Sequence, residues 1–256
     1  MAQAVVVIAG SPPWTEGAAD ILRERGYTPV HYSERTGYVA RLADAHAAMI
    51  LVGDGEDWRF WAVTPKTSPA TRRIPVIVVT GDAELQDAAL RSGANLVLTR
   101  DTLLRELPML LEELARVPDP ATLQALEQQC HEALPPEAVE AVSRFNAGEY
   151  YRQHDLFEAL WMEEERPIRD LYRAILQVGI AYYQATLGNQ RGALKMLLRS
   201  QQWLALLPEV CQGIDVAALR ADAARARAEL ERVGEADMAQ FDYSVLKPVK
   251  VIIKQD

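Results

Sequence analysis

Short β-rich runs, most of them built from consecutive Val, Ile and Leu, alternate with amphipathic stretches through the first half of this chain and then stop. The runs lie in AVVVIAG, TPVHYS, AAMILVG, PVIVVTG and ANLVLTR, between residues 4 and 100. Strands that are apolar throughout are buried on both faces, and parallel strands need a helix-length connection between them. The pattern therefore predicts an α/β unit with a parallel sheet.

The second half has a different period, because apolar residues recur there at helical spacing from residue 121 onward. Short loops between these stretches predict an antiparallel helical bundle with no strand before the last residues. Two prolines in VPDPATL (117–123) indicate the linker. The predicted domains are 1–117 and 118–256, the latter ending in an extended tail, YSVLKPVKVIIKQD, which is apolar enough to pack on a neighbouring element.

Composition excludes several classes of protein. The chain has 256 residues and a net charge of −9, which argues against a nucleic-acid footprint and against binding to an anionic membrane. No apolar run approaches the roughly 18 residues of a membrane span. Cys130 and Cys211 form no CxxC motif and no signal segment is visible, so we expect a cytoplasmic protein with unpaired cysteines.

The ends of the predicted strands carry a specific set of residues. The order of elements resembles the response-regulator receiver, a flavodoxin-like doubly wound sheet, over residues 1–116. Receivers place an acidic pair after the first strand, a phosphoacceptor Asp after the third, Thr or Ser after the fourth and Lys after the fifth. Here those positions hold Gly10 to Pro13, Gly53, Thr80 and Arg100.

Only Thr80 matches that receiver pattern, and no carboxylate follows the first strand to hold Mg²⁺. Asp54, one residue beyond the acceptor position, is the weak candidate for a shifted phosphoacceptor. We therefore expect a degenerate receiver that docks or dimerises independently of phosphorylation; a homodimer is one such assembly. The following stretch, with Trp58, Phe60 and Trp61, is expected to face the core.

The stretch FNAGEYYRQHDLFEALW (145–161) carries the main candidate site of the second half. Asn146 is expected to cap the helix with Glu149 as its reciprocal partner, and Phe145 is expected to pack on the first turn. On a helical wheel, His154 and Glu158 then fall in the middle of the aromatic face. We expect this pair to be buried.

The next predicted helix, which begins after Pro167, is apolar almost all round and is therefore expected at the centre of the bundle. Its polar residues share one narrow stripe, formed by Asp170, Arg173, Gln177 and Gln184. Buried polar groups need partners, so this stripe is predicted to face His154 and Glu158.

These motifs resemble the bacterial and archaeal domain of unknown function 309 over roughly residues 135–210. The residues that carry the resemblance are Phe145, Asn146, Gly148, Tyr150, His154, Glu158, Trp161, Gln177, Gly188, Asn189, Gly192 and Ala193. Asp155 and Tyr183 are mild departures from the family pattern. The resemblance implies an all-helical bundle and implies no activity.

Three roles for His154 and Glu158 remain open. They could share a metal ion, although two ligands are too few for a site; they could act in acid–base catalysis, with Arg173 clamping an anion; or they could form a hydrogen-bonded scaffold. No cofactor motif is visible, so no cofactor is expected. We favour a non-catalytic module that binds a protein or a small molecule, with ligand-binding candidates Arg173, Gln177, Trp161, Tyr151 and Asn189.

Overall fold

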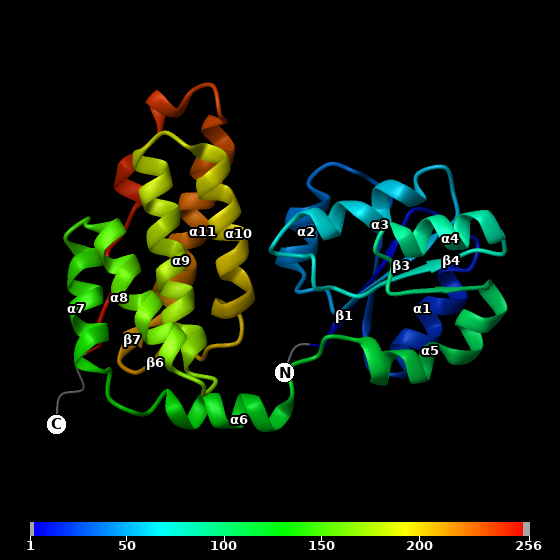
Figure 1. Cartoon of the computed structure of the whole chain (residues 1–256), viewed down its shortest axis with the longest axis horizontal. Coiled ribbons are helices and arrows are strands. Elements are labelled where there is room, and N and C mark those ends of the chain that lie inside the picture. Colours follow the sequence, from blue (N-terminus) through cyan, green and yellow to red (C-terminus); the bar gives the residue numbers. More distant parts are fainter. Residues whose placement is uncertain (1–2, 253–256) are drawn as a thin grey trace. The chain divides into compact units, whose positions relative to one another are not determined.

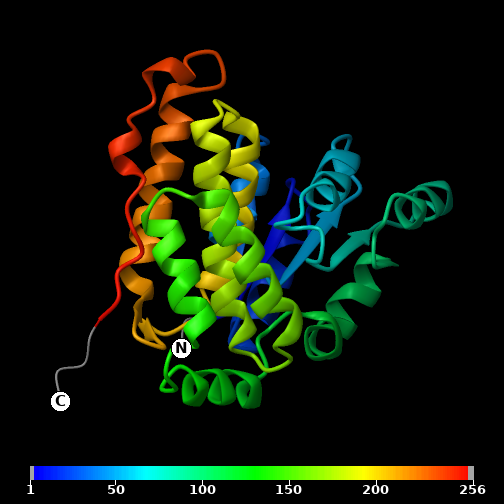
Figure 2. The same ribbon diagram turned by 60° about the vertical axis from the view of Figure 1, so that its left-hand side comes forward.

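The structure is a computed structural model that describes residues 3–252. The chain divides into two compact units, Met1–Val117 and Pro118–Asp256, which Figure 1 and Figure 2 show in two views. The hydrophobic core clusters of the first unit, one on each face of its sheet, are separate from that of the second. We call them the receiver-like unit and the helical unit.

The receiver-like unit is built on a five-stranded parallel sheet with the order β2-β1-β3-β4-β5. The sheet confirms the predicted flavodoxin-like class, whose strand order reverses between β1 and β3. Each strand lies within one of the five apolar runs: β1 Val5–Ala9, β2 Thr28–Tyr32, β3 Met49–Gly53, β4 Val76–Val79 and β5 Leu96–Leu98.

Helices cover both faces of this sheet. α1 (Thr15–Glu24) and α5 (Arg100–Leu114) pack on one face, and α2 (Tyr38–Asp44), α3 (Trp58–Thr67) and α4 (Ala83–Arg91) pack on the other. Trp61 of α3 is 3% exposed, with Trp58 and Phe60 partly buried beside it, which confirms that this stretch faces the core.

The helical unit contains α6 to α11, which confirms the predicted helical bundle. Consecutive helices from α7 to α11 pack side by side with short connections, while α6 lies across their ends (Figures 1 and 2). The central helix is α9, which is buried on nearly every side. The bounds are α6 Pro120–Gln129, α7 Pro136–Asn146, α8 Tyr150–Glu163, α9 Arg169–Thr186, α10 Gln190–Leu204 and α11 Val216–Val233.

Among the described residues, no helix combines the length and the apolar character that crossing a membrane requires. The expectation that no strand precedes the last residues of the second half is wrong. A hairpin of β6 (Val210–Cys211) and β7 (Ile214–Asp215) interrupts the helices. Its turn residues, Gln212 and Gly213, have φ of 48° and 76°, the positive values that a tight two-residue hairpin needs.

The expectation of unpaired cysteines is wrong. Cys130, just after α6, and Cys211 of the hairpin form a disulfide across 81 residues of sequence. Both are buried, at 5% and 0% exposure. Local spacing carries no sign of this pairing, because the two cysteines meet only through the way α6 crosses the end of the bundle.

The tail packs on the helical unit through residue 252, and its last predicted residues, 253–256, lie outside the described part. Val249 is 3% exposed, and Asn146 brackets its backbone: Asn146 Nδ2 donates to Val249 O at 2.9 Å and Val249 N donates to Asn146 Oδ1 at 2.7 Å. Further along, Val251 bridges Ile214 of the hairpin. The tail is thus held at two places.

The expected capping role of Asn146 is therefore wrong. Asn146 is the last residue of α7, and Glu149 takes the N-cap position of α8 without a side-chain capping bond. The expected contact of Phe145 with Tyr150 does form, with ring centroids 5.4 Å apart. The side chain of Asn146 serves the distant tail in place of the nearby helix end.

Replacing Asn146 with Ala should therefore loosen the tail. Two hydrogen bonds would be lost, with a net cost of about 1–2 kcal/mol. We therefore expect amide exchange at Val249 to become about tenfold faster. Asn146→Asp keeps the acceptor for the Val249 N–H and should show an intermediate rate. Hydrogen exchange measured by NMR checks this, and an unchanged Val249 rate in Asn146→Ala would show that the bracket contributes nothing.

Candidate functional sites

The carboxyl edge of the parallel sheet lacks the receiver chemistry in its geometry as well as in its sequence. Gly53 closes β3, and a Cβ atom at this position would lie 2.7 Å from the Cβ of Pro12. The proline that follows β1 therefore occupies the space that an acceptor side chain would need. Thr80 is 2% exposed and its Oγ1 accepts a hydrogen bond from Asp82 N at 3.1 Å, so it supports the turn into α4.

A cavity of about 410 Å³ lies at this edge. Its walls come from the segments that follow β1 and β3 and from the start of α3, so it sits where the strand order reverses. Its lining includes the carboxylates of Asp54, Glu56 and Asp57 and the indoles of Trp58 and Trp61.

The three carboxylates of this cavity are not equivalent. Asp57 forms an ion pair with Arg35, whose Nε donates to Asp57 Oδ2 at 3.2 Å and whose guanidinium lies 5.0 Å from the centre of the Phe60 ring. Within residues 3–252, neither Asp54 nor Glu56 forms an ion pair, and both are exposed. The cavity therefore keeps a local negative charge.

In the helical unit, the predicted burial of His154 and Glu158 is wrong. Glu158 is exposed, and the side chain of His154 is 27% exposed with its Nδ1 3.2 Å from Asp155 Oδ1. The buried face of α8 centres on Phe157, about 60° round the helix from the expected direction. The rotation is physically reasonable, because burying an unpaired carboxylate costs far more than burying a neutral amide.

Two glutamines occupy the interior that was predicted for the His–Glu pair. Gln153 of α8 is fully buried and Gln177 of α9 is 3% exposed. Gln153 Nε2 donates to Tyr150 O at 2.9 Å, and its amide lies against Gly179, where a Cβ would be only 2.3 Å from Nε2. Sequence reasoning missed Gln153; the glycine in the middle of α9 was the available signal of a close approach.

The polar stripe of α9 meets α8 and α10 at Arg173, and the polar contact that His154 makes is with Asp155. The guanidinium of Arg173 lies between two indoles, 4.7 Å from the Trp161 ring and 3.8 Å from the Trp203 ring. Burial raises the pKa of the neighbouring Asp170, opposed by the charges of Arg173 and Arg169. Of the predicted ligand residues, the structure thus brings Trp161 and Arg173 together.

The remaining predicted ligand residues lie apart from this stack. Tyr151 is 59% exposed and packs beside His154 and Tyr183 at the surface. Asn189 caps α10 by accepting a hydrogen bond from Gly192 N at 3.0 Å. Asn189 therefore has a structural role in the bundle.

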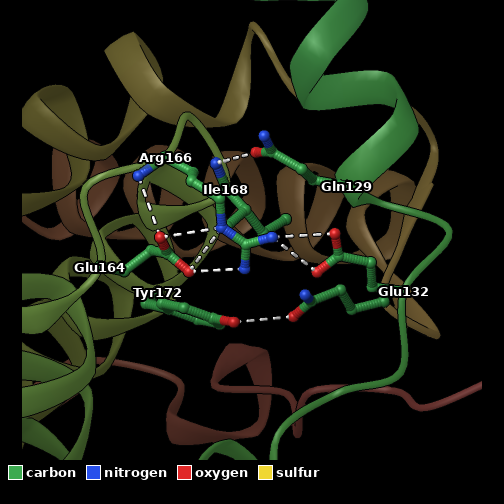
Figure 3. Close-up of polar contacts among 7 residues, drawn as sticks. Gln129, Glu132, Glu164, Arg166, Ile168 and Tyr172 are labelled. Atoms are coloured by element: carbon green, nitrogen blue, oxygen red, sulfur yellow. Dashed lines mark hydrogen bonds and ion pairs between the residues drawn. The ribbon is translucent and has the colours of Figure 1, made fainter.

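A polar network that the sequence did not reveal surrounds Arg166. Figure 3 shows this side chain between two carboxylates, donating to Glu132 Oε1 at 2.9 Å and to Glu164 Oε2 at 2.8 Å. Hydrogen bonds from Arg166 lower the pKa of Glu164, and the two glutamates raise the pKa of Arg166. The network joins the segment after α6 to the loop before α9.

Hydrogen bonds around this network continue to the disulfide. Tyr172 donates through its hydroxyl to Gln212 Oε1 at 3.0 Å, and Gln212 N donates to Cys130 O at 2.7 Å. A smaller cavity of about 230 Å³ lies here, lined by three glutamates and Arg166 among others. In the part of the chain that the structure describes, no group of three or more His, Cys, Asp or Glu residues could hold a metal ion.

Part of the helical unit is similar to a known protein family. Residues 138–196, from α7 into α10, match the family described as Domain of unknown function (DUF309). An uncharacterized protein from Aquifex aeolicus (strain VF5) is 26% identical over 83 residues. That match covers 32% of this chain and 25% of the relative, so the chain spans about a quarter of that protein's length.

Receiver domains are among the solved structures that are similar to this chain. The receiver domain of a signal transduction histidine kinase from Syntrophus aciditrophicus is 24% identical, covers 46% of this chain and 96% of its own, and has a TM-score of 0.37. That of a sensor histidine kinase from Pseudomonas aeruginosa PAO1, with magnesium in its active site cleft, is 20% identical, covers 44% and 98%, and has a TM-score of 0.38. The comparisons thus return both families that the sequence resembles, DUF309 and the receiver domains.

Proposed function

We propose that this protein is a non-catalytic regulatory binding protein whose receiver-like unit works without phosphorylation. The observation that carries this proposal is the contact between Pro12 and Gly53, which fills the position of the phosphoacceptor side chain. No carboxylate follows β1 to hold Mg²⁺ beside it. The fold of a receiver is kept, and its phosphoryl chemistry is replaced by a differently lined cavity.

The helical unit supports a binding role better than a catalytic one. A catalytic His–Glu pair requires the carboxylate to orient the imidazole, whereas His154 Nδ1 meets Asp155 and Glu158 is exposed. The stack of Trp161, Arg173 and Trp203 joins three helices at a half-buried place. Aromatic and Arg side chains of this kind are favoured at binding surfaces, so we assign partner or ligand binding to this stack.

Exposure to acetyl phosphate and Mg²⁺ should leave the protein unmodified. Asp54 has no metal-binding carboxylate from β1 beside it, so we expect an unchanged intact mass in the wild type. Gly53→Asp should not gain phosphorylation either, because Pro12 occupies the required space.

A phosphoryl adduct on the wild type would overturn the proposal. Its loss in Asp54→Asn would then identify the shifted acceptor. An authentic receiver treated in parallel confirms that the reagent is active.

A further inference from the structure

The charges that line the cavity at the carboxyl edge of the parallel sheet indicate which class of ligand it can bind. Two of its carboxylates, Asp54 and Glu56, are not neutralised by an ion pair within the described residues, while Asp57 is held by Arg35. Low-dielectric walls such as Pro12 and the indole of Trp58 concentrate the field of these charges. The cavity therefore attracts cations and repels phosphate and other anions.

A second observation comes from Trp61. This side chain is 3% exposed, and its indole N–H has no hydrogen-bond acceptor among the residues that the structure describes. Gly10, with φ of 82°, lines the same cavity, and a Cβ there would lie 3.5 Å from Trp61 Nε1. The N–H thus lies at the cavity wall beside Gly10, where it can donate a hydrogen bond to a ligand in the cavity.

The partly exposed indole of Trp58 adds a third constraint. Organic cations are stabilised by the faces of Trp rings, and this attraction is strongest for ammonium and guanidinium groups removed from water. A bare metal ion fits the same cavity poorly, because its carboxylates do not form part of any metal-holding group in residues 3–252. The volume of about 410 Å³ is within the range of small-molecule sites.

We propose that this cavity binds a small organic cation that also carries a hydrogen-bond acceptor. Asp54 and Glu56 face its positive charge, the Trp58 ring lies beside it, and Trp61 Nε1 donates to its acceptor atom. This inference rests on the proposed function, because Asp54 can attract a cation in this way only while it is not phosphorylated. The two can fail separately, because phosphorylation is read as mass and cation binding is read on untreated protein.

The test follows the indole N–H signals of the full-length protein by NMR, with the Trp61 signal assigned from Trp61→Phe. Three probes cover the class: ethanolamine, choline and argininamide. We expect at least one to shift the Trp61 signal saturably. When that probe is choline, 3,3-dimethylbutan-1-ol, which has the same shape without the charge, should not shift it. Saturable binding weakened by added salt supports the proposal.

Charge-removal variants locate the binding. Asp54→Asn combined with Glu56→Gln should weaken it at least about tenfold, since two attractive charges are lost. The matched control is Glu24→Gln with Glu113→Gln, which removes two exposed carboxylates on α1 and α5 and should bind normally. Unchanged amide spectra away from the cavity show that the variants are folded.

Three results would overturn the proposal. The first is no saturable shift with any of the three probes. The second is equal binding by choline and its neutral analogue, or equal weakening by both double variants. The third is tighter binding of N-acetyl-arginine methylamide than of argininamide, because this would assign the cavity to an Arg side chain of a partner protein and not to a small molecule.

Discussion

Reduction of the bond between Cys130 and Cys211 should lower the free energy of unfolding of the helical unit by about 4 kcal/mol. The bond closes a loop of 81 residues, and loop-closure entropy of the unfolded chain gives a value of this size. The loop contains α7 to α10, so nearly the whole bundle depends on it. Amide exchange in α9, which reports on this unit alone, measures the change.

The control for this experiment is the double variant Cys130→Ala with Cys211→Ala. Its stability should match that of the reduced wild type and should not respond to reductant. The receiver-like unit, followed through exchange in β4, should be unaffected in every case. Equal protection of α9 in the oxidised and reduced wild type would show that the link adds no stability.

Replacing Gly179 with Val should destabilise the same unit by on the order of 3 kcal/mol, at the upper end for overpacked cores. The new side chain would begin 2.3 Å from Gln153 Nε2, and Gln153 is fully buried and cannot move into solvent. Denaturant unfolding of the variant measures the loss. Ala159→Val, at an exposed position of α8, controls for the helix propensity of Val.

A double-mutant cycle tests the stated cause. Gln153→Ala vacates the space that the new side chain needs, so the two substitutions together should cost at least about 1 kcal/mol less than the sum of the single changes. Strict additivity would mean that the loss in Gly179→Val arises from something other than contact with Gln153.

The elements of this protein were predictable because they depend on local pattern. Short β-rich runs located all five strands of the parallel sheet, and helical spacing located the helical bundle. The contact of Phe145 with the first turn of α8 also followed from the sequence. Burial periodicity and capping are properties of neighbouring residues, so a single sequence contains them.

The rotation of α8 was not predictable in the same way. The aromatic residues of α8 cover a wide arc of the helix surface. Both His154 and Gln153 lie close to this arc on the helical wheel. The packing of α7 and α9 decides which direction is buried. The choice of Gln153 follows from the space above Gly179 on another helix, which no count along α8 can reveal.

Long-range pairings account for the other differences. The disulfide joins residues 81 positions apart, and Asn146 meets Val249 across 103 positions. Asn146 also has a plausible local use as a helix cap, which the sequence favours and the structure does not adopt. A residue type that suits two roles can be assigned only when its distant partner is known.

The bracket that Asn146 places around Val249 also has a consequence for synthesis on the ribosome. Segment 247–252 is translated after α6 to α11, yet it pairs with the end of α7 and with the β6–β7 hairpin. The receiver-like unit is complete by residue 117 and can fold while the bundle is still being made. The helical unit, in contrast, is complete only after this C-terminal segment has emerged, and until then the nascent chain exposes the place that Val249 later covers.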